Sequence, residues 1–300
     1  MKNILKLTPL LIILFLVARY NENITKFVIE NFVYYNKNTE IINNEYALNY
    51  NYLYISSVTD FSVTDKKDLL NTLYTILNSG EEEFSFYCDY EACTSDLNTL
   101  INTNSLSTIN NFVHPYNSYK KVYVTINSYN KVTISFIKTY SNDDIKNIET
   151  KIDEITNNII TDEMSNKEKI IAFHNYIIDN ARYDSDYINN NLNDINSPSH
   201  TAMGILFNGK ALCGGYADVM SIFLNRLNIP NFLVASEYHV WNAVYLDNNW
   251  YHLDLTWDDP VTNDKKDIRL DKFLLISDST LTSFNTGFHE FDRNIYLEFN

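Results

Sequence analysis

The chain has 300 residues, about twice the usual length of one domain, so we expect two domains or one domain with a long extension. Hydrophobic residues make up 45% of it, which is enough for a sizeable core and excludes a wholly disordered protein. The formal net charge of -15 makes nucleic acids and anionic membrane surfaces poor partners, and the presence of only six glycines argues against a glycine-rich phosphate loop.

The first residues carry an export pattern. Lys2 and Lys6 precede an apolar run over Leu7–Ala18, and polar sequence begins at Arg19. This order is typical of the charged and hydrophobic regions of a signal peptide, and the run is short of the roughly 20 residues that a membrane span needs. We therefore expect residues 1–19 to be a signal peptide or a single N-terminal membrane anchor, and the protein to be secreted or anchored outside the cytoplasm.

Residues 20–160 mix short alternating runs with amphipathic helical patterns, which predicts a small α+β domain of unknown role. Lys121–Ile126 and Lys131–Ile137 are β-branched runs joined by an Asn-containing segment, a pattern typical of a β-hairpin. Asp143–Ile160 follows as a polar amphipathic helix that we interpret as a bridge to the second half.

The three cysteines are an odd number. Cys88 and Cys93 lie close enough in the sequence for a local disulfide if the protein reaches an oxidising compartment. Such a pair would leave Cys213 as the free thiol.

The second half opens with a strong helix start. Ser165 and Glu168 have the spacing of a capping box, in which each side chain satisfies a free backbone amide. His174 lies beside the apolar face of the helix that follows, and we expect it to be a packed or surface histidine.

Cys213 lies in the run Gly209–Ala217, directly before a segment with helical hydrophobic spacing. A cysteine at the start of a helix is activated by the unpaired amides and the dipole there, because both favour the thiolate. Gly214 and Gly215 allow backbone to pack closely behind the sulfur and leave room in front for a substrate. A buried structural cysteine is the alternative interpretation.

Two later segments alternate like strands. Tyr238–Tyr245 contains His239, and Trp250–Thr256 has His252 and Asp254 on one face, with a hairpin turn between the segments. A nucleophilic cysteine, a histidine and an orienting carboxylate are the groups that nucleophilic catalysis requires.

The distance between the histidine and the carboxylate depends on the hairpin register. With Asn248 and Asn249 as a two-residue turn, Asp254 pairs with Ala243 and lies about 13 Å along the strand from His239. Strand twist, a bulge or a longer turn would then have to bring them together.

Three motifs in this order resemble the core of the bacterial transglutaminase-like superfamily, over about residues 163 to 290. They are Gly-Lys-Ala-Leu-Cys-Gly-Gly-Tyr-Ala, Tyr-His-Val-Trp-Asn-Ala-Val and Trp-Tyr-His-Leu-Asp-Leu-Thr-Trp-Asp-Asp-Pro. The resemblance implies a papain-like α+β fold in which a helix bearing the cysteine packs on an antiparallel sheet. It also implies Cys213 as nucleophile, His239 as general base and acid, and Asp254 as the orienting carboxylate.

Gly214 departs from the family pattern, which often has a polar residue after the cysteine. This departure affects the cleft more than the three catalytic side chains. We expect three parts in the chain: the N-terminal segment 1–19, the α+β domain 20–160 outside the resemblance, and a transglutaminase-like catalytic domain over 161–300.

The chemistry implied is attack of the Cys213 thiolate on a carboxamide, with a thioester as intermediate. The oxyanion would be stabilised by the backbone amide of Cys213 and a second donor that the sequence does not identify. Trp241 is a candidate wall or donor, or else a core aromatic. The predicted substrate-binding residues are Trp241, Gly214, Gly215 and Tyr216.

Other polar residues carry weaker signals. Asp258 and Asp259 are expected to be solvated in a turn, and His289 is expected at the surface. We expect no metal, because His252 with Cys213 and His239 lacks the usual spacing of metal ligands, and no cofactor.

Three functions are compatible with the sequence. The first is an exported transglutaminase-like enzyme acting on protein or peptide amides by acyl transfer, deamidation or hydrolysis. The second is a cysteine peptidase or amidase with water as the only acceptor, and the third is a non-catalytic surface-binding or scaffold protein.

Overall fold

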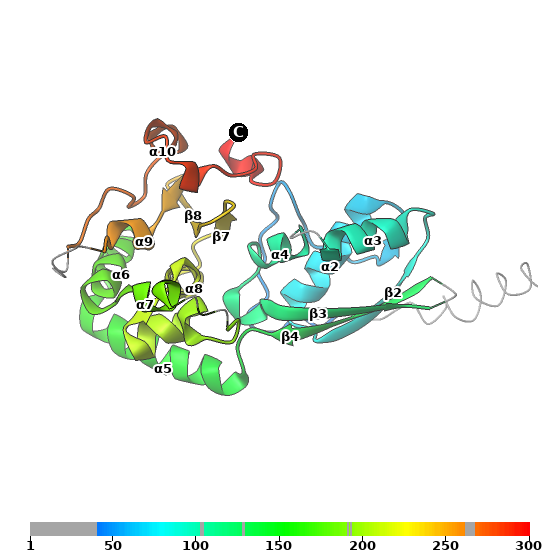
Figure 1. The fold of residues 1–300 in the computed structure, drawn as a ribbon, viewed down its shortest axis with the longest axis horizontal. Coiled ribbons are helices and arrows are strands. Elements are labelled where there is room, and N and C mark those ends of the chain that lie inside the picture. The colour runs from blue at the N-terminus through cyan, green and yellow to red at the C-terminus, as the bar shows by residue number, and fades with distance from the viewer. Residues whose placement is uncertain (1–40, 103–104, 128–129, 191, 193, 262–267) are drawn as a thin grey trace, which may run out of the picture. The chain divides into compact units, whose positions relative to one another are not determined.

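The computed structural model describes residues 41–102, 105–127, 130–190, 192, 194–261 and 268–300 (Figure 1). By its internal contacts the chain divides into residues 1–42 and residues 43–300, and all the helices and strands given below belong to the second unit. The predicted export segment 1–19 lies outside the described residues. Within the described ranges, no helix combines the length and the apolar character needed to cross a membrane.

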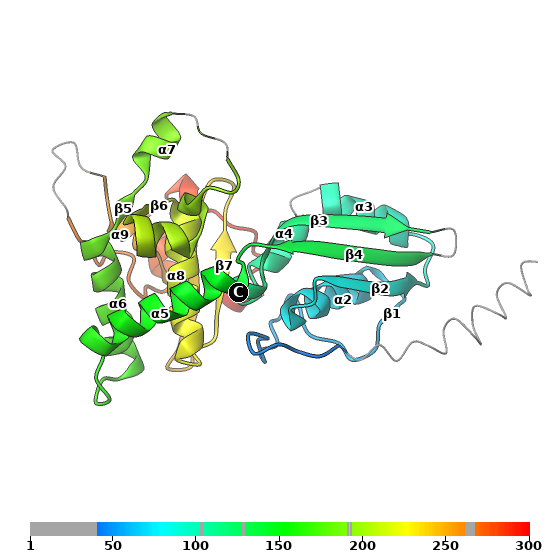
Figure 2. The ribbon, with the colours of Figure 1, turned by 90° about the horizontal axis from the view of Figure 1, so that it is seen from below.

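A four-stranded sheet occupies the N-terminal part of this unit, in the order β1-β2-β4-β3. The predicted hairpin is confirmed, because β3 and β4 pair antiparallel and β2 pairs antiparallel with β4. Helices α2 and α3 lie beside this sheet (Figure 2). The elements are β1 (Ser62–Val63), α2 (Lys66–Ser79), β2 (Glu83–Cys88), α3 (Cys93–Asn102), α4 (Ser105–Asn110), β3 (Tyr119–Ile126) and β4 (Lys131–Lys138).

The local disulfide between Cys88 and Cys93 is confirmed. It joins the end of β2 to the start of α3, and the two Cα atoms are 5.9 Å apart. Cys213 is therefore the free cysteine, as expected.

Three helices share the core of the second half: α5 (Asn142–Ile159), α6 (Asn166–Asn180) and α8 (Cys213–Arg226). The predicted capping box at the start of α6 is present, since Ser165 and Glu168 each bind the other's backbone amide. Phe173 of α6 stacks on Phe223 of α8 with ring centroids 4.0 Å apart. The isoleucines of α5 enter the same core, so this helix packs with the predicted catalytic part, and the division at residue 160 stays a prediction.

A second antiparallel sheet consists of β7 (Asn231–Ala235), β8 (Val240–Leu246) and β9 (Asn249–Leu253), in that order. Helix α8 contacts β7 and β8, so a helix that begins at the cysteine packs on an antiparallel sheet.

The predicted register of the β8–β9 hairpin is wrong by one residue. Its turn consists of Asp247 and Asn248, because Leu246 pairs with Asn249 and Ala243 pairs with His252. Both turn residues have positive φ, 51° and 63°, which Asp and Asn tolerate and which suits the twist of a tight hairpin.

Shorter elements connect these layers. A two-stranded parallel ladder pairs β5 (Arg182–Tyr183) with β6 (Lys210–Ala211). The others are α7 (Ser185–Asn189), a π-helical turn at Gly204–Asn208, α9 (Leu255–Asp258), α10 (Asp278–Ser283), and 3-10 turns at Pro115–Asn117, Pro198–His200, Gly287–His289 and Leu297–Phe299.

The expectation that Asp258 and Asp259 are solvated is wrong, since both are buried. The chain forms α9 directly after β9, and Asp258 accepts a hydrogen bond from the Phe273 backbone amide at 2.9 Å. Its other oxygen lies 3.2 Å from His174 Nε2, so His174 is buried and bound to a carboxylate. The fold is mixed α+β as predicted, while its papain-like assignment and a separate preceding domain stay predictions.

Candidate functional site

Cys213 is the first residue of α8, and its side chain is half-buried. The first amides of a helix have no acceptor inside it, so those of Cys213 and Gly214 are directed toward the space in front of the helix. The Cys213 side chain interacts with the ring of His239 and contributes to the raised pKa of that histidine. A thiolate here gains both from the helix dipole and from the adjacent histidine.

His239 lies just before β8 and Asp254 just after β9, and the corrected register brings them together. Since Asn242 pairs with Leu253, Asp254 falls opposite Trp241, about 7 Å along the strand from His239 instead of 13 Å. His239 Nε2 lies 2.6 Å from Asp254 Oδ2. The nitrogen that remains for Cys213 is therefore Nδ1.

The carboxylate of Asp254 binds four donors. Oδ1 accepts the backbone amides of Thr256 at 3.0 Å and Trp257 at 3.2 Å, because Asp254 caps the N-terminus of α9. Oδ2 faces His239 at 2.6 Å and His289 at 2.9 Å. These contacts fix the position of a side chain that is only 2% exposed.

The buried pair of His239 and Asp254 favours its charged form. Burial opposes charge on His239, but the charge and hydrogen bond of Asp254, with a further contribution from Cys213, raise its pKa to about 10. Burial likewise opposes charge on Asp254, but His239 and then His289 lower its pKa to about 2. An imidazolium between a carboxylate and a thiol stabilises the thiolate, the reactive form of the sulfur.

His289 is the residue of this network that the sequence interpretation missed, and its expected surface position is wrong. It is 6% exposed, and its ring stacks on Phe273. Its Nδ1 lies 2.7 Å from Thr286 Oγ1, so a neutral ring can accept from Thr286 while Nε2–H donates to Asp254. No local motif marks this residue, which lies 35 positions after Asp254.

Trp241 is 1% exposed and stacks on His239 with centroids 5.6 Å apart. Its indole N–H donates to His252 Nδ1 at 3.0 Å, so it serves as a wall beside the imidazole, and its donor is already used. His252 is also buried and stacks on Phe299.

The glycines after the cysteine are explained by close backbone packing. A Cβ on Gly214 would lie 2.9 Å from the His200 carbonyl oxygen, and one on Gly215 would lie 2.7 Å from that of Thr201. Tyr216 is 1% exposed and donates its hydroxyl to Asp259. A direct contact of these residues with substrate stays a prediction.

Among the described residues, His239 Nε2, Asp254 Oδ2 and His289 Nε2 form a group whose atoms all lie within 4.8 Å of one another. Such a set could hold a metal ion. The hydrogen bonds from both histidines to Asp254 already account for the arrangement without one.

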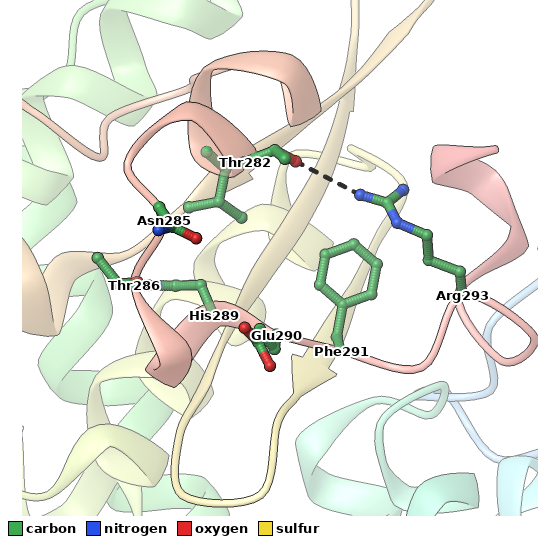
Figure 3. Close-up of a pocket in the computed structure, with 8 residues that line it drawn as sticks. Thr282, Asn285, Thr286, His289, Glu290, Phe291 and Arg293 are labelled. Carbon is green, nitrogen blue, oxygen red and sulfur yellow. Dashed lines mark hydrogen bonds between the residues drawn. The ribbon is translucent and has the colours of Figure 1, made fainter.

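A pocket of about 220 Å³ opens next to His289 (Figure 3). Its lining residues are Leu281, Thr282, Asn285, Thr286, His289, Glu290, Phe291 and Arg293. Cys213, His239 and Asp254 are not among them, so His289 is the one residue of the hydrogen-bonded group around Asp254 that lines this pocket.

Comparison with known proteins finds one family model that matches the part of the chain containing Cys213, His239 and Asp254. The model of the transglutaminase-like superfamily matches residues 153–255, a range that includes Cys213, His239 and Asp254 and ends before His289. A crystal structure described as that of a TGase is similar at 17% identity and a TM-score of 0.36, and the match covers 50% of this chain and 46% of that one. This chain thus spans about half the length of that solved structure. No curated protein matches.

The raised pKa of His239 gives a test of the ion pair. Because that pKa rises from 6.5 to about 10, the pair's contribution to stability is complete below pH 6.5 and is lost as the pH rises to 10. In an NMR titration of the histidine ring signals, we expect His239 to titrate near pH 10. In Asp254→Asn the pKa should fall toward or below 6.5, since burial then opposes the charge. A wild-type pKa near 6.5 would refute the ion pair.

Removal of the His289 donor should destabilise the fold. His289→Phe leaves buried Asp254 Oδ2 with one donor fewer, at an expected loss of about 1.5–3 kcal/mol in the free energy of unfolding. His289→Gln retains an N–H donor and should lose less. Denaturant unfolding measures both, and equal losses would show that the ring's packing, rather than its hydrogen bond, matters here.

Proposed function

We propose that this chain, whose residues 153–255 match the model of the transglutaminase-like superfamily, is a cysteine enzyme that attacks protein or peptide amides through a thioester. The observation that carries this proposal is the 2.6 Å contact between His239 Nε2 and Asp254 Oδ2, on a histidine whose pKa the Cys213 side chain also raises. This arrangement supports the order of nucleophile, proton carrier and orienting carboxylate that the proposed chemistry needs.

In the acylation step, the Cys213 thiolate attacks the carbonyl carbon of a carboxamide such as a glutamine side chain. The carbonyl oxygen becomes an oxyanion in the tetrahedral intermediate. When the intermediate collapses, His239 Nδ1–H gives its proton to the amide nitrogen, the C–N bond breaks and ammonia leaves. The products are a thioester on Cys213 and a neutral His239.

In the second step, an amine or water attacks the thioester and loses its proton to His239 Nδ1. The C–S bond breaks, and the thiolate and imidazolium are restored. An amine acceptor gives cross-linking or aminoacylation, whereas water gives deamidation, or proteolysis when the substrate is a peptide bond. Asp254 serves both steps by holding the ring with Nδ1 toward the sulfur.

Export is part of the proposal. The pattern of residues 1–19 supports it, and so does the disulfide between Cys88 and Cys93, because such bonds persist in oxidising compartments. Expression of the full chain in a bacterial host, followed by fractionation, should find the protein in the medium, the periplasm or the membrane with its disulfide formed. Recovery in the cytosol with both cysteines reduced would contradict export.

The enzymatic proposal predicts an activated thiol. We expect iodoacetamide to alkylate Cys213 near neutral pH at least about tenfold faster than a free cysteine, since its side chain interacts with His239 at the start of a helix. His239→Ala should remove this advantage. Mass spectrometry locates the label, and the disulfide-bonded cysteines should stay unlabelled.

Incubation with a glutamine-rich protein should then release ammonia, and a fluorescent amine should be incorporated if the acceptor is an amine. Cys213→Ala should abolish both signals. Alkylation at the rate of an ordinary thiol, together with no ammonia release, would refute the enzyme and favour a binding or scaffold role. Peptide-bond cleavage without ammonia release would identify a peptidase.

A further inference from the structure

The proposed reaction generates an oxyanion twice, and such intermediates are stabilised by hydrogen-bond donors placed around the oxygen. The backbone amide of Cys213 is one, because it is at the first position of α8. The indole N–H of Trp241 is bound to His252, so it does not supply the second. Beyond the free amides of the first turn itself, a side-chain donor can come from another element beside that turn.

Strand β5 runs beside the segment that leads into Cys213. Tyr183 of β5 pairs with Ala211 of β6 in a parallel ladder, and the next amide, that of Asp184, donates to the Ala211 carbonyl at 2.9 Å. Paired residues of a ladder have their side chains on the same face. The Ala211 Cβ lies 2.6 Å from the position that a Cβ on Gly215 would occupy, so this face is directed at the first turn of α8.

The Tyr183 side chain extends along that face. It is half-buried and packs against the core that contains α8. Charge on Cys213 would oppose ionisation of its phenol, and charge on Tyr183 would oppose ionisation of Tyr216, so the ring lies within electrostatic range of two residues of the first helical turn. Cys213 and Tyr216, three residues apart, lie on one side of the helix.

The Tyr183 hydroxyl forms no hydrogen bond with any other residue in the part of the chain that the structure describes. The tyrosines beside it differ, since Tyr187 binds the Asp194 carbonyl and Tyr216 binds Asp259. Burial, and then the nearby charges of Cys213 and Asp184, raise the pKa of Tyr183. The hydroxyl is therefore protonated at neutral pH and able to donate.

We propose that Tyr183 is a catalytic residue whose hydroxyl, together with the backbone amide of Cys213, donates to the oxyanion of each tetrahedral intermediate. No proton is transferred: the hydroxyl hydrogen-bonds the developing negative oxygen and keeps its hydrogen. This inference rests on the proposed function, because a protein that forms no tetrahedral intermediate has no oxyanion to stabilise.

Tyr183→Phe tests the role, because it keeps the ring and removes the hydroxyl. We expect the kcat of ammonia release from a glutamine-rich protein to fall by about 100-fold to 1,000-fold, with KM changed little. Iodoacetamide alkylation of Cys213 should stay within about twofold of wild type, since displacement of iodide forms no oxyanion. This difference separates loss of the donor from loss of the activated thiol.

Tyr251→Phe is the matched control. Tyr251 is also a half-buried tyrosine packed against this core, and its change should alter neither measurement. An unchanged kcat in Tyr183→Phe would overturn the inference while leaving the enzyme proposal intact. Parallel loss of kcat and alkylation would show a structural role instead. Failure of the wild-type protein in both assays would refute the proposed function, and this inference with it.

Discussion

The hydrogen bonds of the Asp254 carboxylate are the constraint on which the site depends. Asp254 lies between the last strand of the second sheet and helix α9. Its Oδ1 accepts the backbone amides that cap α9, and its Oδ2 is hydrogen-bonded to two histidines. A buried charge of this kind is tolerable only when its hydrogen-bonding capacity is filled. The same contacts that stabilise it also fix His239 with one nitrogen toward Cys213.

The site is assembled from distant parts of the second half. The cysteine comes from the start of a helix, His239 and Asp254 flank one β-hairpin, and His289 comes from the C-terminal segment. The residues beyond the family match therefore complete the hydrogen bonding of a carboxylate within it. Loss of the C-terminal segment would leave Asp254 with an unfilled site in a buried position.

The elements that have strong local sequence signals could be predicted from the sequence. The helix start at Ser165, the hairpin after Lys121 and the helical position of Cys213 follow from capping, alternation and periodicity, and the structure has each of them. The register of the β8–β9 hairpin could not be predicted from the sequence, because three consecutive Asx residues allow the two-residue turn to begin at either of two positions. One residue there changes the separation of His239 and Asp254 by two positions along the strand.

Contacts between residues far apart in the sequence could not be predicted from local sequence patterns. His289 and the buried Asp258 read as surface residues, and only the tertiary packing of Trp257, Phe273 and α6 gives them buried partners. Polar side chains with such partners are satisfied in the core, a possibility that hydropathy alone does not reveal.

Trapping of the acyl-enzyme tests the central claim most directly. A glutamine peptide is mixed with the protein, the reaction is quenched in acid, and the intact protein and its digest are examined by mass spectrometry. We predict an adduct on Cys213 with the mass of the peptide less one ammonia, absent from Cys213→Ala and strongly reduced in His239→Ala. A protein that hydrolyses or transfers the amide with no adduct on Cys213, or that forms the adduct at another residue, would contradict the account.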